Sequence, residues 1–187
     1  MKKFSMIASA GLIIFITACN NSGEKSATTD TTAASMTPST STGDKNIATV
    51  HAINDAISSG DIAKLDQYIA KDGVDHSGDN GKEVKGLDSI KAELAHMHDT
   101  YKDLKLESTQ DAANNDYVFS LTRFKGTNTV ASMGAPAGTN FDMTSVNVAK
   151  FNSEGKVTDH WIYMSEDDVM KMMGGNMKME DMKGKHK

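Results

Sequence analysis

The sequence predicts an α+β domain in which helices come first and an antiparallel β-sheet follows. Two observations support this fold class. Apolar residues recur at helical spacing from residue 47 to residue 101, and from Leu104 onward β-branched and aromatic residues partly alternate with polar ones. Helices followed by consecutive strands are typical of such folds. A length of 187 residues accommodates one domain with appended segments.

Three helices are expected before the strands. The first begins at Asp44, its expected N-cap, and ends at Gly60. A shorter helix follows with Asp61 as its cap, and the segment GLDSIKAELAHMHDTY forms the third. Their apolar stripes consist of Ile47, Val50, Ile53 and Ile57, then Ile62, Leu65 and Ile69, then Leu87, Ile90, Leu94, Met97 and Tyr101.

Four strands are expected after the third helix. They correspond to the segments LKLEST, DYVFSLTRFKGT, NFDMTSVNVAKF and KVTDHWIYM. The residues of turns separate them, as in Asn114-Asn115-Asp116 and Asn152-Ser153-Glu154-Gly155.

The N-terminus has the pattern of an export signal. Lys2 and Lys3 precede an apolar run from residue 6 to residue 15, which is much shorter than the roughly 20 residues of a spanning helix. Residues 16–19 read Ile-Thr-Ala-Cys and resemble the lipobox of bacterial lipoproteins. The resemblance implies cleavage after residue 18, a lipid on Cys19 and attachment to the membrane. Asn20 after the cysteine favours the outer membrane.

The segment after Cys19 is expected to be a flexible tether. Residues 19–44 are rich in Ser, Thr and Ala and lack aromatic side chains, so they cannot bury enough surface to offset their conformational entropy. The expected organisation is a signal peptide at 1–18, the lipidated cysteine and tether at 19–44, a folded domain at 45–174 and a Met/Lys-rich tail at 175–187. The protein is therefore expected in the bacterial cell envelope.

Charge and cysteine content exclude several classes of function. The formal net charge is −5, which argues against nucleic-acid binding. Cys19 is the single cysteine, so an intramolecular disulfide and a thiolate zinc site are both excluded. No cofactor is expected.

Residues 47–174 resemble the SnoaL-like polyketide cyclase family, also called ester cyclases, which has the nuclear-transport-factor-2-like fold. The matching pieces, in order, are AINDAISSGDIAKLDQYIAKDGVDH, GLDSIKAELAHMHDTYKDLKLE, FKGTNT, MGAPAGTNFDMTSVNVAKFNSEGKVTDHW and DDVMKMMG. The resemblance implies a cone, in which a curved antiparallel sheet wraps around the N-terminal helices and leaves a pocket for a ligand. It also allows a homodimer, because many domains of this fold pair through the open sheet face.

The chain departs from the family pattern at three places. Asn128 stands where the family often has a histidine, and the double-proline loop is reduced to Ala135-Pro136-Ala137-Gly138. The catalytic aspartate of the aldol cyclases commonly follows the strand tryptophan by four residues, and Ser165 occupies that position here. Glu166 next to it would point to the other face of a strand. We therefore expect Ser165 to cap a terminal helix whose first turn holds Glu166, Asp167 and Asp168.

The resemblance places five side chains in the pocket: His76, Asn128, Trp161, Tyr163 and Ser165. His76 is the candidate catalytic residue, because an imidazole with a pKa near 6.5 can exchange protons at neutral pH. The alternatives are a strand-end histidine bonded to Asp75 or to the backbone, and aromatic side chains that only pack in the core.

The remaining histidines do not predict a metal site. His96 and His98 are two residues apart on the third helix, so they point to different faces; His96 should be solvated and His98 should border the apolar stripe. His51 lies beside the stripe of the first helix. The tail contains methionines, whose thioethers suit Cu(I), and His186. Its alternative interpretation is a terminal helix sealed by Met170 and Met173, with a soluble end.

The leading hypothesis is a membrane-anchored SnoaL-like domain that binds a small apolar molecule, with proton-transfer activity such as isomerisation, aldol cyclisation or hydrolysis left open. The first alternative is a non-enzymatic binding or scaffold module of the envelope whose cone is filled by its own side chains. The second alternative is Cu(I) binding by the tail.

Overall fold

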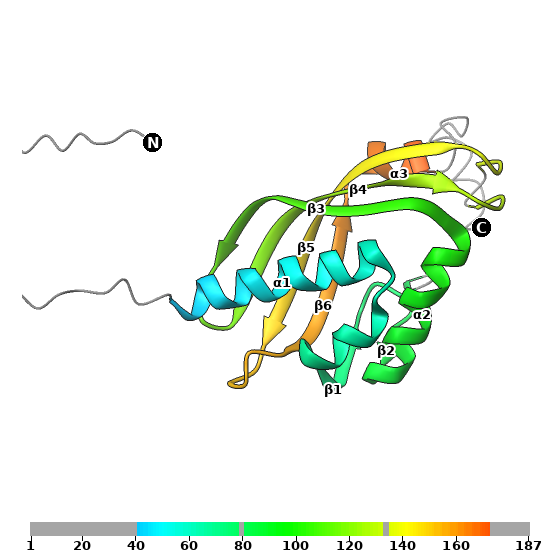
Figure 1. The fold of residues 1–187 in the computed structure, drawn as a ribbon. Helices are drawn as coiled ribbons and strands as arrows, with labels where there is room; N and C mark the ends of the chain where they lie inside the picture. The colour runs from blue at the N-terminus through cyan, green and yellow to red at the C-terminus, as the bar shows by residue number, and fades with distance from the viewer. Residues whose placement is uncertain (1–40, 79–80, 133–134, 173–187) are drawn as a thin grey trace, which may run out of the picture. The chain divides into compact units, whose positions relative to one another are not determined.

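The computed structural model describes residues 41–78, 81–132 and 135–172 (Figure 1). The predicted signal peptide, most of the tether and the tail from residue 173 lie outside this part of the chain. The elements, in order, are α1 (Thr42–Ser59), the 3₁₀ helix η1 (Ile62–Gln67), β1 (Ile69–Asp75), β2 (Val84–Lys85), α2 (Leu87–Thr100), β3 (Tyr101–Ala113), β4 (Tyr117–Asn128), β5 (Asn140–Phe151), β6 (Val157–Met164) and α3 (Glu166–Met172).

The strands form one six-stranded sheet in the order β2-β1-β6-β5-β4-β3. The α+β class is confirmed, but the prediction of a purely antiparallel sheet is wrong, because β1 runs parallel to β6. All other neighbouring strands pair antiparallel. Parallel neighbours need a long crossover, and here β2, α2 and β3 to β5 provide it. Residue patterns identify strands but not which distant strand becomes the neighbour.

Helix α1 begins three residues earlier than predicted. Its N-cap is Ser41, whose Oγ accepts a hydrogen bond from the Asp44 backbone N at 3.1 Å, while Asp44 Oδ2 accepts one from the Ser41 backbone N at 3.0 Å. Asp44 is thus the third helical residue of a capping box and not the N-cap. The predicted end is confirmed, since Gly60 caps the helix with a φ of 76°, which glycine adopts without strain.

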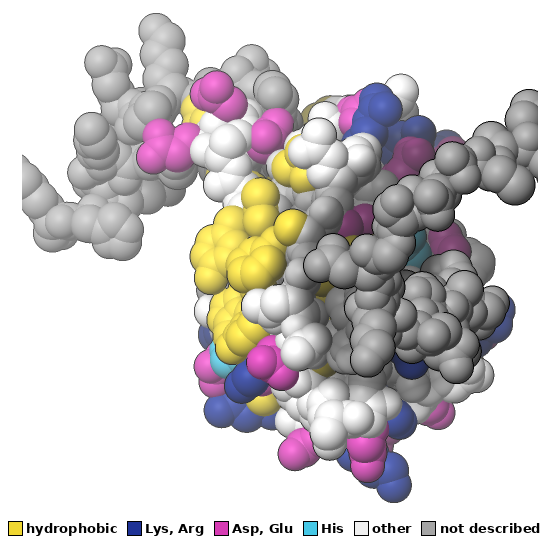
Figure 2. All heavy atoms as spheres, turned by 90° about the vertical axis from the view of Figure 1, so that its left-hand side faces the viewer, with side chains coloured by type: hydrophobic (Ala, Val, Ile, Leu, Met, Phe, Trp, Pro, Cys, Tyr) yellow, Lys and Arg dark blue, Asp and Glu magenta, His cyan; other side chains and the backbone are white. Residues whose placement is uncertain are grey.

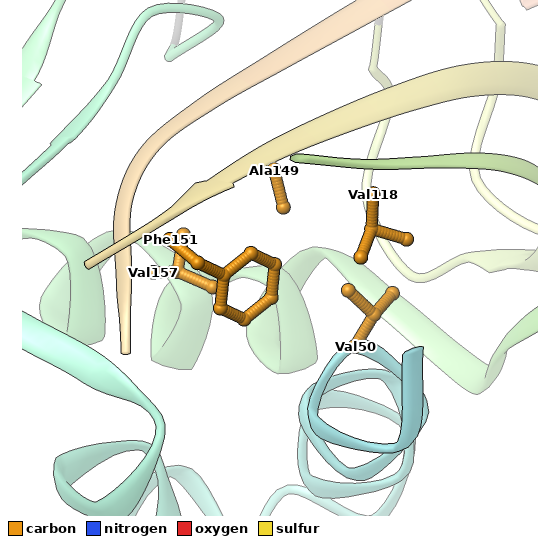
Figure 3. Packing of buried hydrophobic residues seen from close by; sticks show 5 residues of the cluster. All are labelled: Val50, Val118, Ala149, Phe151 and Val157. Carbon is orange, nitrogen blue, oxygen red and sulfur yellow. The ribbon is translucent and has the colours of Figure 1, made fainter. Parts of the chain in front are cut away.

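Helix α1 lies across one face of the sheet, and the long strands β3 to β5 curve over it (Figure 1). Val50 from α1 packs with Val118, Ala149, Phe151 and Val157 from β4, β5 and β6 (Figure 3). We call this helix-covered side the inner face of the sheet and the opposite side the outer face. A second cluster, formed by Ala56, Leu65, Ile69, Leu87 and Ile90, joins α1, η1, β1 and α2.

Helix α2 leads directly into β3 and is fastened to α1. His98 Nε2 lies 2.5 Å from the carbonyl oxygen of Ile57, near the end of α1. His96 is exposed, as predicted, and pairs with Asp99 on its own helix. None of the described helices combines the length and apolar content needed to cross a bilayer.

The terminal helix is capped as the sequence predicts. Ser165 Oγ accepts a hydrogen bond from the Asp168 backbone N at 3.1 Å and donates one to Asp168 Oδ2 at 2.6 Å. Glu166, Asp167 and Asp168 form the first turn of α3, where carboxylates favour the helix dipole. Ser165 is therefore a capping residue, and the adjacent carboxylates belong to a helix rather than to a strand.

Candidate functional site

The register of the sheet decides which side chains can reach the space beneath the helices. Val118, Ala149 and His160 occupy one cross-strand row, and the first two belong to the core beneath α1. Because side chains alternate along a strand, His160 points to the inner face and Trp161 to the outer face. Tyr163 follows Trp161 on the outer face and is 58% exposed.

His76 also lies on the outer face. Its ring stacks on that of Trp161, with ring centroids 4.6 Å apart and planes 5° from parallel. The residue before it, Asp75, is the parallel partner of His160 and therefore points inward. The prediction that His76, Trp161 and Tyr163 point toward the helix-covered side is wrong. His76 and Trp161 do stack, but on the outer face, where Tyr163 also lies.

Both ring nitrogens of His76 are held by carboxylates. Nδ1 lies 2.9 Å from Glu83 Oε1, and Nε2 lies 3.1 Å from Asp159 Oδ1. These contacts fasten the segment that leads into β2 onto β6. The hydrogen bond to Asp159 is the main reason that the pKa of His76 is raised; burial opposes it, and Glu83 adds to it. The catalytic role of His76 stays a prediction, whereas its structural role follows from these contacts.

The raised pKa of His76 predicts a stability that depends on pH. A group whose pKa is higher in the folded state stabilises the fold fully below its unfolded value, near 6.5, and loses this contribution as pH rises through the raised value. In wild type the free energy of unfolding should therefore fall over this interval more than in a His76→Gln variant. Urea unfolding of both proteins from pH 6 to pH 9 measures this difference. If the free energy of unfolding changed equally with pH in the two proteins, the prediction would be contradicted.

The inner face carries a second carboxylate–imidazole pair that sequence reasoning missed. His160 Nδ1 lies 3.1 Å from Asp75 Oδ2, and His160 Nε2 lies 3.1 Å from Asn147 Oδ1. The Asn147 amide in turn donates a hydrogen bond to Ser145 Oγ at 2.9 Å. These four side chains form a continuous polar chain from β1 across β6 to β5.

The two pairs arise from one sequence feature. The dipeptide Asp-His occurs at residues 75–76, at the end of β1, and at residues 159–160 in β6. Because the strands are parallel and in register, each aspartate bonds the histidine of the other dipeptide. The backbone adds a bond from His76 N to His160 O at 2.8 Å. This repeated dipeptide was the signal that could have identified His160.

The polar chain suits His160 to exchange protons. As an imidazolium, His160 can donate hydrogen bonds to both Asp75 and Asn147. As a neutral ring, it can accept a hydrogen bond from the Asn147 amide nitrogen once that amide has flipped by 180°. Burial raises the pKa of Asp75, but hydrogen bonds from His160 and from the Ser77 backbone outweigh it, so the net pKa lies below the usual value. A charged Asp75 therefore remains available to orient the ring at neutral pH.

Solvent reaches the inner face beside His160. The His160 side chain is 29% exposed. Ile162, the next inward residue of β6, is 39% exposed although it faces the helices.

Other polar groups continue across the inner face. Asp111 Oδ1 accepts a hydrogen bond from Ser120 Oγ at 2.5 Å, and Asp111 Oδ2 lies 2.7 Å from His51 Nε2. The buried hydroxyl of Thr122, cross-strand partner of both Ser108 and Ser145, has no hydrogen-bond partner among the described residues. Asn128 is 6% exposed, so it contributes to the packed end of the inner face. The inner face thus carries a band of polar groups, whereas the sequence-based hypothesis expects a small apolar ligand.

An aromatic cluster borders this polar band. The rings of Tyr101, Phe124 and Phe141 pack with centroid distances of 4.8 to 5.8 Å. Phe124 and Phe141 belong to inward rows of β4 and β5, beyond Thr122. Within the described ranges, no group of three or more His, Cys, Asp or Glu side chains is arranged to hold a metal ion.

Comparison with known proteins identifies the family. Residues 47–173 match the family model described as SnoaL-like polyketide cyclase. Similar solved structures include a SnoaL-like polyketide cyclase from Agrobacterium tumefaciens, with 15% identity, a TM-score of 0.59, and coverage of 69% of this chain and 98% of that one. TsrD from Streptomyces laurentii is 19% identical, with a TM-score of 0.60 and coverage of 70% and 95%.

A third solved structure also has a similar fold. A protein from Catenulispora acidiphila with a ketosteroid isomerase-like fold, in complex with trimethylamine, is 20% identical, with a TM-score of 0.54 and coverage of 67% of this chain and 92% of that one. The search of curated proteins found no match. At these identities the solved structures show the fold alone, while the family model spans the folded part of the chain. The chain belongs to the SnoaL-like polyketide cyclase family.

Proposed function

We propose that this protein is a membrane-tethered SnoaL-like domain that binds a small molecule at the inner face and transfers a proton through His160. The observation that carries the proposal is the Asp75–His160 pair, which places a partly exposed imidazole on the helix-covered side of the sheet. An imidazole oriented by a carboxylate is a common general acid or base. The family description as polyketide cyclase supports chemistry of this kind.

The inner face also indicates the ligand. Hydroxyl, amide and imidazole groups from Ser145, Asn147 and His160 would bind oxygens, whereas the cluster around Phe124 offers an apolar surface. A molecule with a carbonyl or hydroxyl at one end and an apolar or aromatic body fits this division. The reaction proposed is removal or delivery of a proton at a carbon next to a carbonyl, as in isomerisation or aldol cyclisation.

Native mass spectrometry of the full chain purified from its host in non-ionic detergent tests the binding part of this proposal. A co-purified molecule with the expected polar and apolar parts, released by a Thr122→Leu substitution that fills the inner face, would support it. A chain that carries no small molecule and gains stability from Thr122→Leu would favour the alternative, a module whose cone is filled by its own side chains.

The proposed tether starts at Cys19. One acyl chain gives only marginal membrane binding, at about 0.8 kcal/mol per buried CH₂, whereas the two or three chains of a lipidated cysteine hold a protein on the bilayer. A Cys19→Ser variant should therefore move from the membrane fraction to the soluble periplasmic fraction, or remain as an unprocessed precursor. Fractionation and intact mass measurement check this. A variant processed and retained like wild type would rule out lipidation at Cys19.

Pairing of two copies through the outer face is a second proposal, favoured by exposed apolar side chains there. Phe119, Val146 and Tyr163 are 46%, 40% and 58% exposed, and they lie on adjacent strands of the outer face. Figure 2 shows hydrophobic side chains gathered on one side of the domain.

The oligomeric state in solution tests this pairing. A Phe119→Asp substitution should convert a dimer into a monomer, because it places a charge in the apolar surface. Lys102→Gln on the edge strand β3 is the control and should leave the mass unchanged. Light scattering coupled to size-exclusion chromatography measures both. A wild-type protein that is monomeric at all concentrations would contradict pairing.

A further inference from the structure

Two lysine side chains face each other on the outer face, at the curved ends of β3 and β4. Lys105 and Lys125 are direct cross-strand partners. Like charges in this position repel and destabilise the strand pair. Among the described residues, no carboxylate forms an ion pair with either lysine. The fold therefore holds two positive charges together without neutralising them.

The nearest carboxylate on the neighbouring strand is already engaged. Asp142 is the cross-strand partner of Lys125, but both of its oxygens bind the Arg123 guanidinium, one of them at 2.6 Å from Nε. This two-point contact is the geometry that arginine and carboxylate prefer. Asp142 thus lowers the local positive charge without binding either lysine directly.

The two lysines line a surface hollow of about 440 Å³, within the usual range for small-molecule sites. Its lining consists of Asp103, Lys105, Lys125, Gly126, Thr127, Asn140, Phe141 and Asp142. A register shift between Lys102 and Lys105 accompanies it, and Asp103 adopts a φ of 55°, which is uncommon for a residue other than glycine. Bulges of this kind re-aim side chains at the curved end of a sheet.

The uncharged lining groups can also bind a ligand. The Thr127 hydroxyl donates to Asn140 Oδ1 at 2.8 Å, which fixes the amide and leaves its Nδ2 donors unused by that bond. Asp103 also lines the hollow and offers a hydrogen-bond acceptor. A Cβ at position 126 would lie 2.8 Å from Cζ of Phe141 and 3.1 Å from the Lys102 carbonyl oxygen, so a side chain there would require its neighbours to shift.

We propose that this hollow is a binding site for a small molecule that carries a carboxylate or phosphate group. The anionic group lies between the ammonium groups of Lys105 and Lys125 and removes their mutual repulsion, and the Asn140 amide donates to it. The site is separate from the inner face, because its charged side chains point to the opposite side of the sheet. The proposal therefore stands or fails independently of proton transfer by His160.

Titration of the full chain, labelled with ¹⁵N at lysine only and kept in non-ionic detergent, tests the site. Sodium phosphate in one arm and sodium acetate in the other replace sodium chloride at constant ionic strength. The Lys105 and Lys125 amide signals, assigned from Lys105→Gln and Lys125→Gln, should shift and saturate, whereas those of Lys45 and Lys64 should not. Each substitution should weaken binding by about two- to fivefold, the contribution of one solvent-exposed ion pair.

Lys102→Gln is the matched control, since it removes one charge from the same strand outside the hollow, and it should leave the affinity unchanged. Saturation in the phosphate arm alone would assign a phosphate site, and saturation in the acetate arm alone a carboxylate site. Equal shifts of all lysine signals, without saturation, would show general ion screening and overturn the proposal. A loss of affinity in Lys102→Gln as large as that in Lys125→Gln would overturn it too.

Discussion

Replacing His160 with Gln is expected to lower turnover by about 10²–10⁴-fold, the usual contribution of a general acid or base. Glutamine keeps a polar group at this position but cannot exchange a proton at neutral pH. The readout is deuterium incorporation from D₂O into the molecule that co-purifies with the chain, measured by mass spectrometry. Binding of that molecule should persist in the variant, so the loss should lie in kcat and not in KM.

Two further histidine variants make this result specific. His96→Gln changes an exposed side chain of α2 and should leave turnover unchanged. His76→Ala decides between the two Asp-His pairs, because it removes the histidine of the outer face. A loss confined to His76→Ala would restore the sequence-based assignment and remove His160 as the proton-transfer group. An Asp75→Asn variant should lose less turnover than His160→Gln, because the Asp75 carboxylate orients the imidazole ring without touching the ligand.

Replacing Leu65 with Ala is expected to lower the free energy of unfolding by about 2–5 kcal/mol, the range for a fully buried leucine. Leu65 is 0% exposed and packs where η1, α1, β1 and α2 meet. The truncation removes apolar contacts within this cluster and leaves a cavity that the surrounding backbone can fill only in part. Chemical denaturation followed by circular dichroism measures the change.

Ile62→Ala in the same short helix is the matched control. Ile62 is only partly buried against the same cluster, so its truncation should cost clearly less. Equal losses of stability in the two variants would show that the energetic cost depends on the short helix η1 itself and not on burial of Leu65 in the cluster. A Leu65→Ala protein as stable as wild type would contradict the packing described for this cluster.

The residue patterns predicted most of the elements but not β1 and β2. Ile69, expected on the short second helix, begins β1, and Tyr101, expected on the third helix, begins β3. Apolar spacing identified α1, η1 and α2, alternation identified β3 to β6, and Ser165 identified the start of α3. The N-cap of α1 was misplaced because Ser41 and Asp44 are both good capping residues. Their reciprocal hydrogen bonds, visible only in the structure, show that the serine is the cap and the aspartate its partner.

The faces of the sheet could not be read from the sequence. In the segment VTDHWIYM, alternation separates Trp161 and Tyr163 from His160 and Ile162, but it does not say which set meets the helices. The family resemblance placed Trp161 and Tyr163 in the pocket, and this led to the wrong choice. The register of the sheet settles the matter. His160 shares a row with Val118 and Ala149, which pack beneath α1, and the parallel pairing of β1 with β6 turns Asp75 inward with it. That pairing joins residues 85 apart in the chain, beyond the reach of local patterns.

The β1–β6 pairing also has a consequence for the order of folding. Closing a loop of this length costs chain entropy before any contact compensates for it, so strand pairs that are neighbours in sequence should form first. The β3–β4–β5 meander can then assemble early, and β1 would dock along β6 as a late step that completes the sheet. Pulse-labelled amide exchange during refolding should find His76 among the last backbone groups to gain protection.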